Sequence, residues 1–320
     1  MSDVLLTLLQ VAFYLLAVAS FVGWVWLIRR KVLAGLPIIQ PRPRTEPFWS
    51  LAEFFLCFGL WLVCTTAASL TARRLAGMSL PEASDIGTET ADSVLTTPEE
   101  LVAILVAASI ANAVVLLCML VQMGLTNRKV MIEYGLWPDR GDFSLGALAA
   151  VFILPPTLLL SQWLDLFVPY EHQVFDVIKQ NPSLTIFLTM SISAIIVSPL
   201  FEETLFRMLL QGGGQRVARR TETQGQADLP NASTPPSVLI TADEVSQWSW
   251  WPLLIASLTF STMHLGQGAA PIPLFFFSVG VGYLYRQTGR LWPCIIVHFL
   301  LNAFSMIGFG LEVISAGGTP

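Results

Sequence analysis

The run SLTIFLTMSISAIIVSPLFEETLFRMLL, residues 183–210, is apolar along most of its length but carries Glu202, Glu203 and Arg207 near its end. A helix needs about 20 mostly apolar residues to cross the hydrocarbon core of a bilayer. An ionisable side chain at the bilayer centre costs about 2.5–3.5 kcal/mol on insertion scales, so such residues in spans are usually functional. This stretch therefore predicts a membrane helix that contributes to a functional site.

Similar apolar runs occur along the whole chain. Of its 320 residues 54% are hydrophobic and only 12% are charged, whereas roughly a quarter are charged in an average soluble domain. Long apolar runs mark eight candidate spans: 4–28, 49–71, 101–125, 145–168, 183–210, 250–267, 271–286 and 291–313. The composition and these runs predict an all-α fold, a polytopic membrane helical bundle of about eight transmembrane helices.

Basic residues fall in alternate loops of this arrangement. They follow the first, third, fifth and seventh runs: Arg29, Arg30, Lys31, Arg42, Arg44, Arg128, Lys129, Arg140, Arg216, Arg219, Arg220, Arg286 and Arg290. Loops rich in Lys and Arg face the cytoplasm. The pattern predicts a multi-pass protein, expected in a bacterial inner membrane, with a polar cleft that opens toward the cytoplasm. The net charge of −5 argues against nucleic acid as a partner.

The motif-bearing residues are all in the second part of the chain. Residues 1–144 form three predicted helices with no recognised motif, and residues 145–313 form the predicted core. The loop at about 212–247 opens with three glycines and is rich in Gln, Thr, Ser and Pro. Such a composition buries little apolar surface, so we predict a flexible insertion there.

Three polar groups lie on three predicted helices. Glu203 and Arg207 are four residues apart and share a helix face, which predicts an ion pair, whereas Glu202 is rotated by about 100°. His264 lies four residues after Phe260, and Asn302 lies four after His298. With about 1.5 Å of rise per residue from the basic end of each run, Glu202 and His298 lie about 10–12 Å deep and His264 about 21 Å. The first two should therefore be level, and His264 deeper.

These motifs, Glu202-Glu203-x-x-x-Arg207, Phe260-x-x-x-His264 and His298-x-x-x-Asn302, resemble the three motifs of the CPBP intramembrane protease family (CAAX protease and bacteriocin-processing, also called Abi). That family includes the type II CAAX prenyl endopeptidases. The resemblance implies hydrolysis of a membrane-anchored or lipidated peptide beside the lipid bilayer, without a cofactor or metal. It implies that Glu202 and His264 activate water and that His298 and Asn302 bind the oxyanion. Glu203, Arg207 and Phe260 would support them.

Other functions are compatible with the same residues. Glu202, His264 and His298 could bind zinc with water as the fourth ligand, although no His-Glu-x-x-His motif is present. A non-catalytic scaffold or immunity protein could keep the fold and bind a peptide without cutting it. Intramembrane Glu, His and Arg also mark proton-coupled transporters, but no internal repeat is apparent. Intact motifs favour the protease.

Overall fold

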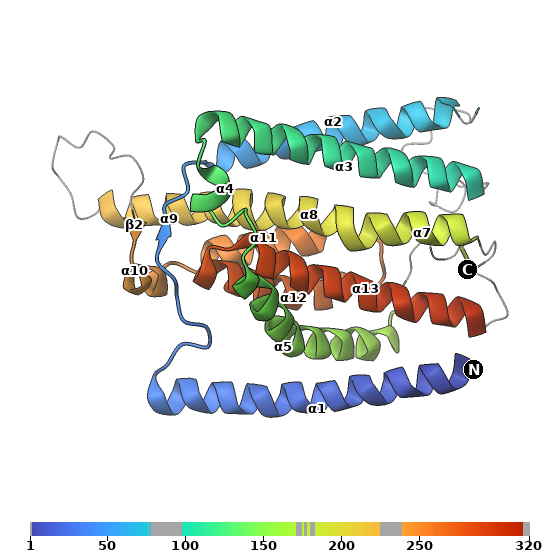
Figure 1. Ribbon diagram of the computed structural model, residues 1–320, viewed down its shortest axis with the longest axis horizontal. Helices are drawn as coiled ribbons and strands as arrows, with labels where there is room; N and C mark the ends of the chain where they lie inside the picture. The colour runs from blue at the N-terminus through green and yellow to red at the C-terminus, as the bar shows by residue number, and fades with distance from the viewer. Residues whose placement is uncertain are drawn as a thin grey trace.

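The computed structural model describes residues 2–75, 77, 98–170, 175, 178–179, 183–224 and 239–315. These residues form a bundle of long helices that run along one axis (Figure 1). In chain order the elements are α1 (Ser2–Ala34), β1 (Arg44–Thr45), α2 (Leu51–Leu75), α3 (Pro98–Thr126), α4 (Val130–Glu133), α5 (Arg140–Asp165), α7 (Leu184–Ile192), η2 (Ser193–Val197), α8 (Ser198–Glu203), η3 (Thr204–Gly212), α9 (Gly213–Gln224), β2 (Leu239–Ile240), α10 (Ala242–Gln247), α11 (Trp251–Thr262), α12 (Pro271–Thr288) and α13 (Leu291–Ser315). The all-α membrane fold is confirmed.

Six helices in the described part of the chain are long and apolar enough to cross a membrane. They correspond to the first five predicted runs and the last one: Thr7–Ala34, Leu51–Leu75, Glu100–Thr126, Arg140–Asp165, Leu184–Thr221 and Leu291–Ile314. The sixth run forms α11, which has only 12 residues and spans about 18 Å of a core about 30 Å thick. The count of eight spans is therefore too high by this criterion. A turn after Thr262 joins α11 to α12, so the two form a helical hairpin.

The loops rich in Lys and Arg gather at one end of the bundle, which we call the basic end. The connections between α1 and α2, α3 and α5, and α9 and α11 lie at this end, whereas α1 begins and α13 ends at the other (Figure 1). β1 pairs antiparallel with β2 at the basic end, with Arg44 opposite Ile240. A hairpin of α11 and α12 returns the chain to its starting side, as two full spans would. The alternation of basic loops is therefore kept.

The second and third helices share one core with the later part of the chain. Phe54 and Val115, from α2 and α3, belong to the same buried cluster as Phe201 and Phe260. The Trp49 indole just before α2 donates a hydrogen bond of 2.8 Å to the Met208 carbonyl oxygen. The boundary between residues 144 and 145 therefore does not separate two hydrophobic cores.

The predicted insertion at 212–247 contains helix near both of its ends, because α9 covers Gly213–Gln224 and α10 covers Ala242–Gln247. The glycines explain the order of α9. A Cβ on Gly213 would lie 3.1 Å from the Ser50 backbone, and one on Gly214 would lie 3.0 Å from Pro252. Without side chains there, α9 approaches two neighbouring segments closely. The remainder, residues 225–238, lies outside the described residues.

A partly buried ion pair joins the basic ends of α5 and α13. Arg290 donates from Nε to Asp142 Oδ1 at 2.6 Å and from Nη2 to Asp142 Oδ2 at 2.5 Å, and Asp142 is only 1% exposed. A bidentate pair of this kind is strong and directional. It positions α13, the helix that carries His298.

Replacing Asp142 by Asn should lower the free energy of unfolding by about 2 kcal/mol, since hydrogen bonds to charged groups contribute about 1.5–3 kcal/mol. Equilibrium unfolding in mixed micelles measures this. Asp243→Asn is the control, because Asp243 is exposed in α10 and should change stability by less than about 0.5 kcal/mol. Equal effects of the two variants would contradict a stabilising role for the pair.

Candidate active site

The two adjacent glutamates lie on an interrupted helix. α7, η2, α8, η3 and α9 follow one another without a break from Leu184 to Gln224, and η2 and η3 are π-helical. Glu202 and Glu203 close α8, between the two π segments. A π turn forms i→i+5 hydrogen bonds in place of i→i+4 and is frequent at functional sites. The Asn302 side chain uses such a turn, because its Nδ2 donates to the Ala194 carbonyl oxygen in η2 at 2.7 Å.

Glu203 anchors a buried polar chain. Its Oε2 accepts from Arg207 Nε at 3.0 Å and its Oε1 lies 2.8 Å from His298 Nδ1, while the side chains of Glu203 and Arg207 are both fully buried. Arg207 also donates from Nη2 to Ser278 Oγ at 2.7 Å. The ion pair predicted from the four-residue spacing is therefore present. Because a carboxylate paired with Arg accepts hydrogen bonds, His298 Nδ1 carries the hydrogen in this contact.

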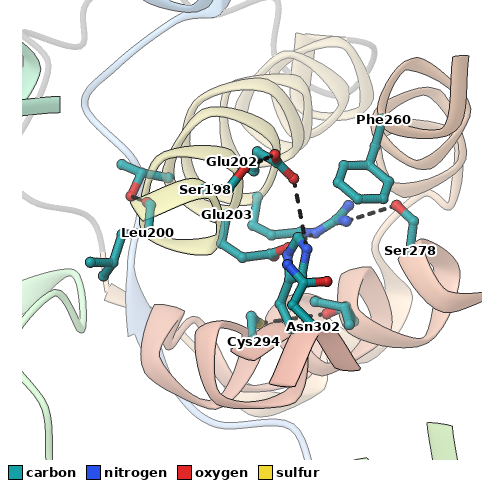
Figure 2. Close-up of polar contacts among 12 residues, drawn as sticks. Ser198, Leu200, Glu202, Glu203, Phe260, Ser278, Cys294 and Asn302 are labelled. Atoms are coloured by element: carbon teal, nitrogen blue, oxygen red, sulfur yellow. Dashed lines mark hydrogen bonds and ion pairs between the residues drawn. The ribbon is translucent and has the colours of Figure 1, made fainter. Parts of the chain in front are cut away.

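Glu202 points to the other side of the same histidine. Its Oε1 accepts from the Ser198 hydroxyl, and its Oε2 lies 3.7 Å from His298 Nε2; Figure 2 shows both contacts. The Glu202 side chain is 20% exposed, whereas Glu203 is fully buried. The neighbouring carboxylates thus differ in surroundings, as their rotation about the helix predicted. Contact with His298 also places Glu202 and His298 at one level.

His264 lies in the turn after α11. Its Nδ1 is 3.0 Å from the Phe260 carbonyl oxygen, which can only accept, so Nδ1 is the donor and Nε2 is left as an acceptor. The Phe260 ring centroid lies 5.0 Å from that of His264 and 5.7 Å from that of His298. Phe260 therefore contacts both imidazoles.

The structure brings together most of the predicted residues but not in the predicted pairing. Among the described residues, the histidine within 4 Å of Glu202 is His298, whereas the His264 imidazole contacts the Phe260 carbonyl oxygen. His264 follows the last turn of a short helix, so it reaches the site from the hairpin turn and not from a helix side. Direct contact between Glu202 and His264 is not part of this conformation.

Two polar residues of the site were missed from the sequence. Ser198 lies four residues before Glu202, so its contact could have been found from helical spacing alone. Ser278, on α12, binds Arg207 from a helix distant in sequence, and no spacing rule identifies it. Figure 2 shows Ser198 beside Glu202 and Ser278 on the side of Phe260.

A catalytic zinc site needs three protein ligands close together. Within the residues that the structure describes, no group of three or more His, Cys, Asp and Glu side chains is arranged to hold a metal ion. The zinc set considered above would need Glu202, His264 and His298 together. The contacts join only Glu202 and His298, so the third ligand would have to move.

Comparison with known proteins supports the resemblance seen in the motifs. Residues 184–304 match a family model described as type II CAAX prenyl endopeptidase Rce1-like. This segment contains Glu202, Phe260, His264, His298 and Asn302 and begins later than the predicted core at residue 145. No curated protein and no solved structure matches the chain. The predicted CPBP and CAAX-protease resemblance is confirmed over the matched segment.

Proposed function

Starting from a CAAX-type intramembrane protease segment at residues 184–304, we propose that this integral membrane protein is a glutamic endopeptidase that cleaves membrane-anchored or lipidated peptides. The observation that carries the proposal is the contact of a partly exposed Glu202 with His298. On its other side the His298 imidazole contacts Glu203, which forms a fully buried ion pair with Arg207. One carboxylate is accessible for chemistry, and the other positions the imidazole.

Glu202 is proposed as the general base. The Ser198 hydroxyl occupies one of its oxygens, which orients the other toward His298 and any water beside it. A positioned carboxylate that takes a proton from water contributes about 10²- to 10⁴-fold to a rate. His264 presents Nε2 as an acceptor. It would accept a hydrogen bond from the second hydrogen of the same water. Both would then activate the nucleophile without touching each other.

His298 and Asn302 are proposed to bind the oxyanion. His298 must carry a hydrogen on Nε2 for this, and it then forms an imidazolium between two carboxylates. With Glu202, Glu203, Arg207 and His298 all ionised the charges sum to zero, which suits a membrane interior. Asn302 uses one amide hydrogen for Ala194 and has a second to offer. Donors fixed in place before the reaction stabilise charge that appears only in the transition state.

The reaction then balances in two steps. The water oxygen bonds to the scissile carbonyl carbon as Glu202 takes its proton, and the carbonyl oxygen becomes the bound oxyanion. The carbon–nitrogen bond then breaks, and Glu202 returns the proton to the leaving amine. The products are a carboxylic acid and an amine, and Glu202 is ionised again. The acid then gives its remaining proton to the amine or to solvent and becomes a carboxylate.

The basic end is proposed to face the cytoplasm of a bacterial inner membrane, following the positive-inside rule. The hairpin of α11 and α12 enters from this end, with Trp250 just before α11 and Tyr283 in α12 stacked at 5.8 Å between ring centroids. Aromatic residues of this kind are typical of the membrane interface. A lipidated chain lying at that surface could reach the site beside the bilayer.

Purified protein in lipid should cleave a membrane-anchored peptide and leave the same peptide uncut when its anchor is removed. His264→Ala should lower kcat by about 10²-fold with little change in stability, because the His264 imidazole is bonded only locally to Phe260. His298→Ala should lower kcat and also destabilise the protein, because it removes a partner of buried Glu203. The measurements are product quantification and unfolding of each variant.

A chelator and a panel of anchored peptides, prenylated and acylated, complete this experiment. Cleavage that persists with chelator and fails in His264→Ala supports the glutamate mechanism. Loss of cleavage on chelation alone would show that a metal is needed. No cleavage of any anchored peptide by the folded wild type would favour the non-catalytic scaffold.

A further inference from the structure

A stripe of polar side chains leads from the site toward the basic end. Glu203, Arg207, Gln211 and Gln215 are spaced by four residues along the continuous helix, and their exposed fractions are 0%, 0%, 0% and 3%. An α turn holds fewer than four residues and a π turn more than four. Side chains four residues apart therefore rotate slowly around the helix axis, in one sense along an α-helix and in the opposite sense along a π-helix. η3 (Thr204–Gly212) joins the first three residues, and α9 carries Gln215. The rotation along η3 is therefore reversed in part along α9, and the four buried side chains form one stripe.

This face packs against α12. Arg207 Nη2 donates to Ser278 Oγ at 2.7 Å, and one turn farther on Gln211 Nε2 donates to the Gly282 carbonyl oxygen at 2.8 Å. Gly282 makes room for the amide, since a Cβ there would lie 3.0 Å from Gln211 Oε1 and 3.1 Å from Leu253 Cγ. The two contacts hold the side chains in an extended row between α12 and η3.

Three buried atoms of the stripe have no hydrogen-bond partner within the described protein: Arg207 Nη1, Gln211 Oε1 and Gln215 Nε2. A buried polar atom without a partner is costly, and native proteins usually satisfy it with ordered water. In order along the helix these atoms are a donor, an acceptor and a donor. Water can accept from each donor and donate to the acceptor between them, so the alternation suits a chain of bound waters.

A small cavity at the basic end meets the last member of the stripe. Its lining includes Arg44, Trp49, Glu133, Gln215 and Tyr285, and Arg44 Nη2 lies 3.4 Å from Gln215 Oε1. Burial lowers the pKa of the Arg44 guanidinium to about 10, still well above neutrality. The cavity is therefore polar on the side of Gln215. The cavity therefore lies where the stripe leaves the apolar part of the bundle.

We propose that Gln215, Gln211 and Arg207 bind a chain of water molecules that connects the basic-end cavity with the Glu203–His298 network. Hydrolysis at a membrane-embedded site consumes water, and this chain supplies it. The water-binding part stands on the geometry alone, whereas the supply role rests on the proposed protease function. If the stripe acted only in helix packing, its orphaned polar atoms would contact no water.

Radiolytic hydroxyl labelling with mass spectrometry tests the water chain without any assay of activity, because buried side chains are labelled when bound water lies beside them. Leu253 and Tyr285 are 0% and 4% exposed and adjoin the stripe and the cavity. Both should be labelled in the wild type, while Ile186, 0% exposed in the separate cluster near the other end, should not. Gln211→Leu removes the acceptor and should reduce labelling of Leu253 severalfold.

Asn112→Leu is the matched control, because Asn112 is a membrane-embedded amide of α3 whose Oδ1 accepts from Trp61 Nε1 at 2.8 Å and which is not a member of the stripe. It should leave the labelling of Leu253 and Tyr285 unchanged. Gly282→Ala is a second test that keeps every polar group, and its Cβ should displace Gln211 and reduce labelling in the same way. Wild-type Leu253 and Tyr285 that resist labelling, or labelling that Gln211→Leu does not alter, would overturn the proposal.

Peptide cleavage then tests the supply role. In Gln211→Leu, kcat should fall about tenfold, the effect of leaving one buried group unsatisfied, with KM unchanged. Reduced labelling with unchanged kcat would overturn the claim that the chain supplies water to the reaction. The claim that waters are bound there would stand. An inactive wild type that still shows the labelling pattern would contradict the protease proposal and not the water chain.

Discussion

Glu202→Gln should abolish cleavage of a membrane-anchored peptide, with kcat lower by about 10²- to 10⁴-fold, because an amide cannot take the proton of the attacking water. Gln has nearly the same shape and can still bond the Ser198 hydroxyl, which contacts Glu202 Oε1 in the wild type. The fold should therefore be retained. Product release measured by mass spectrometry, with the unfolding transition of each variant, separates lost chemistry from lost structure.

Glu53→Gln is the matched control for this variant. Glu53 is also a carboxylate of a membrane helix, but it lies at the start of α2, where it accepts from the Ser50 backbone amide at 2.8 Å. Its replacement should leave kcat within about twofold of the wild type, because surface changes away from a site have small effects. If Glu202→Gln cleaves as fast as Glu53→Gln does, Glu202 is not the base. The activity would then need another carboxylate.

Arg207→Met should give the largest loss of stability, about 3–5 kcal/mol, because it leaves the group of Glu202, Glu203 and His298 with one uncompensated negative charge. Both side chains are fully buried, with 3.0 Å between Arg207 Nε and Glu203 Oε2. Met fills much of the Arg volume, so the change mainly removes charge and hydrogen bonds, including the one to Ser278. Equilibrium unfolding in mixed micelles at constant lipid composition measures the difference.

The double variant Glu203→Gln with Arg207→Met decides whether the loss arises from the unpaired charge. It should recover much of the stability, with an interaction free energy of about 0.5–3 kcal/mol in the mutant cycle. Cleavage should stay low in the double variant, because His298 loses the carboxylate at 2.8 Å that orients its Nδ1. Strictly additive losses of stability would contradict the coupling of Glu203 and Arg207.

Much of the candidate site was predictable from local rules. The Glu203–Arg207 pair follows from a four-residue spacing on one helix, and the common level of Glu202 and His298 follows from the rise per residue. The position of His264 was not predictable in the same way. Its depth was counted along a full span, but α11 ends at Thr262 and His264 lies in a turn.

The fold shows the same division. Long apolar runs were sufficient for six membrane helices, because only a continuous helix satisfies its backbone in lipid. The sequence did not predict the helix α9, because its polar composition resembles that of a flexible loop. Its helix depends on close contacts of Gly213 and Gly214 with Ser50 and Pro252, and those neighbours come from other parts of the chain.

The sequence by itself determined the membrane class, the basic loops and the three motifs, because hydrophobicity and helical spacing are local properties. Only the tertiary structure decided that His298 contacts both glutamates, that Ser278 supports Arg207 and that Gln211 faces Gly282. Each of these contacts joins helices far apart in the chain. Their formation depends on how whole helix faces pack, and no local pattern encodes that packing.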